Sequence, residues 1–111
     1  MSAAQNSITL TNGETTVKVD YLQSKKAALI LRAINHKLRQ QMIKMLHDAK
    51  QMTVTEVYVK LRIEQSVASQ HLAILRRSGI VLTKRDGKFI HYSVNYARIA
   101  EITEFVKALL D

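Results

Sequence analysis

Residues 53–79 read TVTEVYVKLRIEQSVASQHLAILRRSG, and this stretch decides the fold. Thr53-Val-Thr-Glu56 places a hydroxyl three positions before a carboxylate, which is typical of a capping box at the start of a short helix. A tight turn at residues 62–63 follows, and a second helix is expected over Glu64–Arg77. This helix is expected to end at Ser78-Gly79, because glycine readily takes the left-handed backbone that closes helices. Two helices joined by so short a turn predict a helix-turn-helix.

The segments that flank this unit complete a winged fold. Residues 80–84 and 89–94 are rich in β-formers and surround an Asp-Gly turn, which predicts a hairpin, the wing. Apolar residues at helical spacing predict further helices on both sides of the unit. Their expected bounds and caps are Asp20–Ile34 capped by Asp20, His36–Asp48 capped by Asn35, and an amphipathic helix over Asn95–Leu110. The predicted fold class is mainly α with a small β-hairpin, a winged helix-turn-helix.

Residues 1–19 precede the winged domain, which is expected to span residues 20–111. From Ile8 to Val19, apolar and polar residues alternate around Asn12-Gly13, a pattern that favours a hairpin. A lone two-stranded hairpin is only marginally stable in water. This stretch is therefore either a short β-hairpin or a flexible arm.

The charge balance points to a polyanionic partner. The chain has 17 Lys and Arg against 9 Asp and Glu, which gives a formal net charge of +8. Nucleic acid is the first candidate and an anionic membrane surface the second. However, the chain has no Trp and no long apolar run, and its start lacks the basic-then-apolar pattern of a signal peptide. We therefore expect no membrane association and a cytoplasmic location.

Three stretches at the joints of this predicted fold carry a resemblance to a known family. They are Ala33-Ile-Asn-His-Lys-Leu-Arg39, Gln65-Ser-Val-Ala-Ser-Gln-His-Leu72 followed by Leu75-Arg76, and Ser78-Gly-Ile-Val81. Together they resemble the ArsR/SmtB family of bacterial transcriptional regulators, over roughly residues 25–95. The resemblance implies a dimer formed through the first and last helices, with two recognition helices in successive major grooves. The apolar stripes of both terminal helices favour a dimer independently, although these stripes could instead pack on their own core.

The predicted helix over Glu64–Arg77 separates an apolar side from a polar side. The apolar side carries Ala68, Leu72 and Leu75, and the polar side carries Ser66, Gln70, Ala73 and Arg77 with Ser69 flanking. The polar side suits a major groove, where Gln can bond adenine and Ser can bond bases or phosphates, although ordinary solvated helices also carry such residues. The cations of the wing tip suit the phosphate backbone. The expected DNA-binding residues are Gln65, Ser66, Ser69, Gln70, His71, Arg77, Arg85 and Lys88, with His71 either orienting the helix or meeting a phosphate.

The sequence predicts no metal, cofactor or catalytic site. The absence of cysteine excludes disulfides, thiolate metal sites and cysteine nucleophiles. Many members of the resembled family release DNA on binding a metal, but their ligand positions correspond here to Val54–Lys60 and to Tyr96, Arg98 and Leu109. These residues do not form a useful zinc site. The histidines, which are His36, His47, His71 and His91, show no i, i+4 pairing. No nucleophile elbow or phosphate-binding glycine loop is present, so the protein is not expected to be an enzyme.

The leading functional hypothesis is a sequence-specific regulator of transcription, a homodimeric repressor that binds an inverted repeat in double-stranded DNA. The alternatives are a basic protein-interaction module that docks on an acidic partner and a nonspecific nucleic-acid-binding protein. Gln70 distinguishes these hypotheses, because its change to alanine weakens base reading but leaves a generic basic surface unaltered. The sequence leaves the operator and the effector open.

Overall fold

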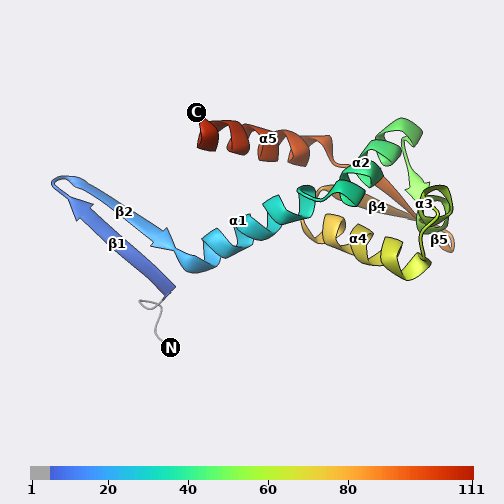
Figure 1. The fold of residues 1–111 in the computed structure, drawn as a ribbon, viewed down its shortest axis with the longest axis horizontal. Helices are drawn as coiled ribbons and strands as arrows, with labels where there is room; N and C mark the ends of the chain where they lie inside the picture. The colour runs from blue at the N-terminus through green and yellow to red at the C-terminus, as the bar shows by residue number, and fades with distance from the viewer. Residues whose placement is uncertain (1–5) are drawn as a thin grey trace. The chain divides into compact units, whose positions relative to one another are not determined.

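The structure is a computed structural model that describes residues 6–111, and the chain divides into two units. The first unit ends at Leu31, and the second runs from Arg32 to Asp111. Figure 1 traces the chain through both. No helix among the described residues is long and apolar enough to cross a membrane.

The first unit begins with a two-stranded antiparallel hairpin. Strand β1, Ser7–Asn12, pairs with β2, Thr15–Asp20, and Gly13 in the turn has a φ of 64°. Helix α1, Tyr21–Ile34, follows and crosses the boundary between the units. Its first turn is capped as predicted, since the Gln23 amide donates to Asp20 Oδ1 at 3.1 Å. Part of the predicted arm, residues 1–5, lies outside the described residues, and the domain boundary after residue 19 stays a prediction.

The second unit is the predicted winged helix-turn-helix (Figure 1). Its elements are α2 (Lys37–Ala49), β3 (Met52–Thr53), α3 (Val54–Leu61), α4 (Gln65–Arg77), β4 (Val81–Asp86), β5 (Phe89–Val94) and α5 (Tyr96–Leu110). Strands β4 and β5 form the predicted hairpin, with Asp86 opposite Phe89 at the tip. Strand β3 was not predicted; it adds to β5, so that the sheet order is β3-β5-β4. Two residues are too few to show an alternating pattern in the sequence.

The helix starts of the second unit confirm one predicted cap and correct another. Thr53 forms the full capping box with Glu56: the Glu56 amide donates to Thr53 Oγ1 at 3.3 Å, and the Thr53 amide donates to Glu56 Oε1 at 2.9 Å. The prediction that Asn35 caps α2 is wrong. Helix α2 starts one residue later than expected, and the extended residue before it is His36, whose Nδ1 accepts from the Arg39 amide at 3.4 Å.

The core of the second unit lies between α2, α3, α4 and the sheet. The predicted apolar side of α4 is confirmed, because Ala68, Leu72 and Leu75 are each 0% exposed. The apolar stripe of α5 is different: Ile102 is buried, but Phe105 is 48% and Leu109 66% exposed. Helix α1 likewise leaves apolar side chains exposed. Much of the apolar surface of each terminal helix is therefore left uncovered by the unit to which it belongs.

We expect Thr53→Ala to lower the free energy of unfolding by about 1 kcal/mol, because the change removes the hydroxyl that caps α3. Thr55→Ala is the matched control, since Thr55 is exposed on the same helix. Urea denaturation of both variants measures the difference. Equal stabilities for the two variants would contradict the capping role.

Candidate nucleic-acid interface

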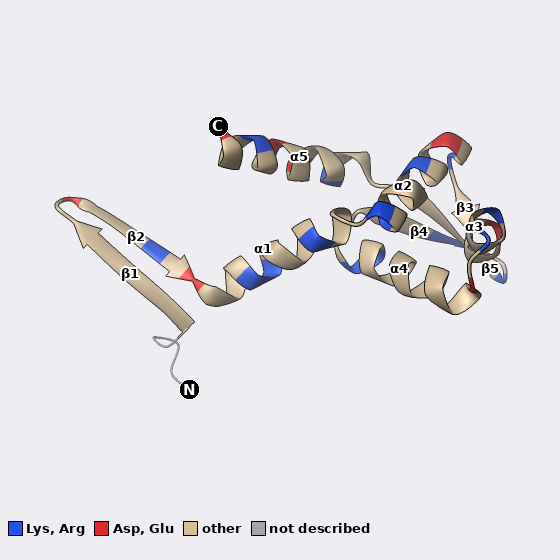
Figure 2. Ribbon diagram, viewed as in Figure 1, with Lys and Arg blue, Asp and Glu red and all other residues tan. Residues whose placement is uncertain are grey.

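Helix α4 presents a polar side that the rest of the unit leaves uncovered. Five of the predicted site residues lie exposed on it, while His71 is half-buried; the exposed ones are Gln65, Ser66, Ser69, Gln70 and Arg77. The helix contains no Asp or Glu, and Figure 2 shows basic residues at its C-terminal end and on β4. The exposed side of α4 is therefore polar and free of negative charge, as contact with a polyanion requires.

The turn before α4 fixes how the two helices of the motif meet. Arg62 takes the left-handed conformation with a φ of 57°, and its amide donates to Val59 O at 3.3 Å. The chain then enters α4 through Glu64, whose extended backbone precedes the helix but whose side chain makes no capping hydrogen bond. The amides of the first turn of α4 therefore lack a side-chain acceptor from the N-cap residue, and such amides attract anions.

The wing tip carries two exposed cations. Gly87 has a φ of 62°, which suits the tight turn between β4 and β5, and Arg85 Nε donates to Gly87 O at 3.2 Å. Lys88 Nζ lies 5.5 Å from the centre of the Phe89 ring. The ion pairs among residues 6–111 are Lys44–Asp48 and Arg98–Glu101, so neither wing cation is neutralised by a carboxylate.

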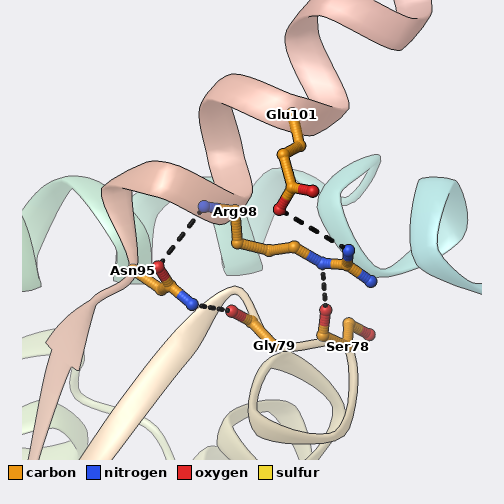
Figure 3. Close-up of polar contacts among 5 residues, drawn as sticks. All are labelled: Ser78, Gly79, Asn95, Arg98 and Glu101. Atoms are coloured by element: carbon orange, nitrogen blue, oxygen red, sulfur yellow. Dashed lines mark hydrogen bonds and ion pairs between the residues drawn. The ribbon is translucent and has the colours of Figure 1, made fainter.

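The C-terminal end of α4 is joined to the start of α5 (Figure 3). Arg98 Nε donates to Ser78 O at 3.1 Å, and Asn95 Nδ2 donates to Gly79 O at 2.9 Å. Asn95 also caps α5, because its Oδ1 accepts from the Arg98 amide at 3.3 Å. Gly79 has a φ of 75°, and a Cβ there would lie 3.4 Å from Arg98 Nε. Reasoning from sequence missed this joint, since it considered Arg98 only as a position where the resembled family has a metal ligand.

The middle of α4 is joined to α2 through His71, a contact that sequence reasoning also missed. Arg39 Nη1 lies 3.1 Å from His71 Nδ1, and the rings of His36 and His71 lie 4.8 Å apart, tilted by 45°. Burial lowers the pKa of His71, and the nearby His36 and Arg39 lower it further. The spacing of Arg39, Met42 and Leu46 on one helical side was the available signal, because all three are buried on α2.

The positions on α5 where the resembled family has metal ligands do not form a metal site here. Tyr96 Oη lies 2.8 Å from His47 Nδ1. Among residues 6–111, no group of three or more His, Cys, Asp or Glu side chains is placed to hold a metal ion. At the α5 positions, the Tyr96 and Arg98 side chains make hydrogen bonds, and Leu109 is exposed and apolar.

Comparison with known proteins identifies the family. The family model described as "Bacterial regulatory protein, arsR family" matches residues 36–83. The transcriptional activator HlyU of Vibrio cholerae is 34% identical over 86 residues, which are 78% of this chain and 79% of that protein. The chain belongs to the arsR family of bacterial regulatory proteins. The resemblance seen in the sequence is therefore confirmed, and the protein is a DNA-binding transcriptional regulator.

Further relatives and solved structures agree with this assignment. The transcriptional repressor PagR of Bacillus anthracis is 30% identical over 93 residues, 83% of this chain and 92% of that protein. The structure of reduced HlyU from Vibrio cholerae covers 78% of this chain and 92% of its own, with 33% identity and a TM-score of 0.59. NolR from Sinorhizobium fredii covers 80% of this chain and 85% of its own, with 29% identity and a TM-score of 0.63. The winged helix-turn-helix is thus the fold that this arsR-family chain shares with its relatives.

The lowered pKa of His71 predicts a loss of stability in mild acid. The unfolded chain binds a proton at the ordinary histidine pKa of about 6.5, before the folded chain does, so the free energy of unfolding falls as the pH drops below that value. Above it, this group contributes no pH dependence. Urea denaturation at about pH 7.5 and about pH 5.5 measures the change on either side of the ordinary pKa.

His71→Gln is the control, because glutamine is polar and does not titrate. We expect the stability difference between the two pH values to shrink in this variant. An unchanged difference would show that other groups cause the loss.

Proposed function

We propose that this regulator is a homodimeric repressor that reads an inverted repeat in double-stranded DNA, with α4 in the major groove and the wing on the backbone. The observation that carries the proposal is the exposed polar side of α4, which has no acidic residue and lies in the same unit as the cationic wing. Promoter occlusion requires only a DNA-bound dimer. The name of PagR as a repressor supports this direction of control, whereas HlyU is named an activator. The proposal includes a cytoplasmic location and no enzymatic activity.

In this proposal, Gln70 is the main reader of bases. It lies on the exposed side of α4, where a long amide can donate and accept to one adenine edge. Gln65 and Ser66 lie in the first turn, whose amides the N-cap side chain leaves without an acceptor, so these residues suit a phosphate. Ser69 flanks the same side, and Arg77, the last residue of α4, adds a positive charge at its C-terminal end.

The wing supplies affinity in this proposal. Arg85 and Lys88 are exposed and unneutralised at the β4–β5 turn. Contacts from such cations to phosphates release counterions, so they strengthen binding to any sequence and weaken with salt. The preference for one DNA sequence then depends on α4, and the phosphate contacts of the wing fix the position of α4 along the duplex.

The uncovered apolar side chains of the terminal helices support the homodimer. Phe105, Leu109 and Leu110 are between 48% and 79% exposed on α5, and Leu22 and Leu29 on α1 are 53% and 52% exposed. Apolar surface of this kind is stabilised by burial, and a two-fold interface buries the same patch on both copies. A dimer also presents two copies of α4, which is what an inverted repeat requires.

The first test is selection of bound duplexes from a random pool, followed by binding measurements at several salt concentrations. We expect an inverted repeat that binds at least ~10³-fold more tightly than a scrambled duplex. If no sequence is enriched and binding only fades with salt, the proposed repressor is instead a nonspecific binder or a docking module.

Gln70→Ala tests the role of α4 within that site. We expect the preference for the selected duplex over one with a changed contacted base to fall by about 1–3 kcal/mol, while binding to scrambled DNA stays the same. Gln41→Ala on α2 removes the same side chain from an exposed position elsewhere and is the control. Equal effects of the two changes would contradict base reading by Gln70.

Phe105→Glu tests the dimer. The change removes a half-exposed ring and adds a charge on both copies, so we expect the dimer dissociation constant to rise about ten- to a hundred-fold. Thr103→Glu, on a different side of α5, is the matched control. Sedimentation velocity over a range of concentrations measures both, and a wild-type chain that stays monomeric throughout would overturn the dimer.

A further inference from the structure

Arg39 is the one charged side chain that is buried among the described residues, at 6% exposure. Its guanidinium makes three contacts. Nε donates to Ala33 O at 2.6 Å and Nη2 donates to Arg32 O at 2.8 Å, both carbonyls in the last turn of α1. Nη1 lies 3.1 Å from His71 Nδ1 on α4. One side chain on α2 thus bonds the end of α1 and the middle of the helix proposed to read DNA.

The contact with Arg39 decides which nitrogen of His71 carries the hydrogen. A guanidinium has five donors and no acceptor, so His71 Nδ1 must accept. A neutral imidazole that accepts through Nδ1 carries its hydrogen on Nε2. His36 covers the same ring at 4.8 Å, and its own Nδ1 already accepts from the Arg39 amide. The Arg39 contact therefore assigns the hydrogen of the neutral His71 ring to Nε2.

The other nitrogen of His71 reaches the surface. Among residues 6–111, every buried side-chain nitrogen or oxygen of a residue that is not itself exposed has a hydrogen-bond partner. His71 is half-buried, and the hydrogen bond found for its ring is the one at Nδ1. Nε2 is therefore not completely buried, and its hydrogen has no acceptor within the described part of the chain.

We propose that Arg39 is a positioning residue for DNA binding, which holds His71 as the Nε2–H tautomer so that α4 offers this hydrogen to a DNA phosphate oxygen. The proposal rests on the proposed function of α4 and adds to it a residue that need not touch DNA. It also gives His71 a definite role, since the ring is fixed on its inner side by Arg39 and acts on its outer side as a neutral donor. Because Arg39 also bonds the last carbonyls of α1, the donor is positioned relative to that helix end.

A double-mutant cycle separates positioning from mere stability. We expect His71→Ala and Arg39→Lys each to weaken binding to the selected duplex about ten- to a hundredfold, the range for one hydrogen bond to a charged group such as a phosphate. If Arg39 acts through His71, the double variant binds no more weakly than the weaker single variant. If the two losses instead multiply, Arg39 acts independently of His71 and the proposal is overturned.

His71→Gln supplies a rescue, because its amide nitrogen offers an N–H close to the position of Nε2–H. We expect this variant to bind more tightly than His71→Ala at equal folded fraction, as checked by circular dichroism and thermal melting. Equal binding by the glutamine and alanine variants would overturn the donor role. Should Arg39→Lys fail to fold, this pair and the spectra described next decide the outcome.

Long-range ¹H–¹⁵N spectra of histidine-labelled protein without DNA test the tautomer directly, above the ordinary histidine pKa of about 6.5. We expect His71 Nδ1 to be unprotonated and to show the shift of a hydrogen-bond acceptor, with Nε2 protonated. A protonated Nδ1, or a mixture of tautomers, would overturn the proposal. This result stands even if no specific DNA site is found, in which case the proposed function fails while the Arg39–His71 contact remains.

Discussion

The burial of one side of α4 is the constraint on which the rest of the structure depends. Ala68, Leu72 and Leu75 are 0% exposed, and α4 packs with α2, α3 and β4 through that side. Burying three apolar side chains completely fixes the rotation of a helix about its axis, because a turn in either direction would expose them to water. The polar residues on the opposite side are then presented outward as a consequence, with Gln70 near the middle of the helix.

Two arginines outside α4 hold that helix in place along its length. Arg98, from the first turn of α5, bonds Ser78 O beyond the C-terminal end of α4, and Arg39 bonds His71 within it. Arg98 belongs to α5, and Arg39 bonds two carbonyl oxygens in the last turn of α1. The helices proposed to form the dimer are thereby bonded to the helix proposed to read DNA. In a homodimer formed through α5, this arrangement would relate the spacing of the two copies of α4 to the packing of α5.

Sequence reasoning succeeded where the determining interactions are local. The capping box at Thr53, the buried side of α4 and the Asp-Gly wing all depend on residues a few positions apart, and the structure confirms them. It failed where two adjacent residues could each cap a helix: His36 caps α2, whereas Asn35 was expected to do so. A difference of one residue in a helix start changes which side chain can reach the free amides.

The hydrogen bonds that connect α4 to α2 and α5 could not be predicted from the sequence, for a different reason. Arg39 and His71 are 32 residues apart, and Ser78 and Arg98 are 20 apart, so only the packed fold brings each pair together. A periodicity argument places Arg39 on the buried side of α2 but cannot name its partner. The exposed site residues on α4 and the wing were accessible to sequence reasoning because exposure there follows from the helical period and from the turn.

The most direct test of DNA reading by α4 is to map the amide chemical-shift changes of isotope-labelled protein on titration with its selected duplex. If α4 reads DNA, the largest changes lie in α4 from Gln65 to Gln70 and at the wing tip from Arg85 to Lys88. Changes that cluster on α2 or α5 while the amides of α4 stay unchanged would show that α4 is not the DNA-reading helix.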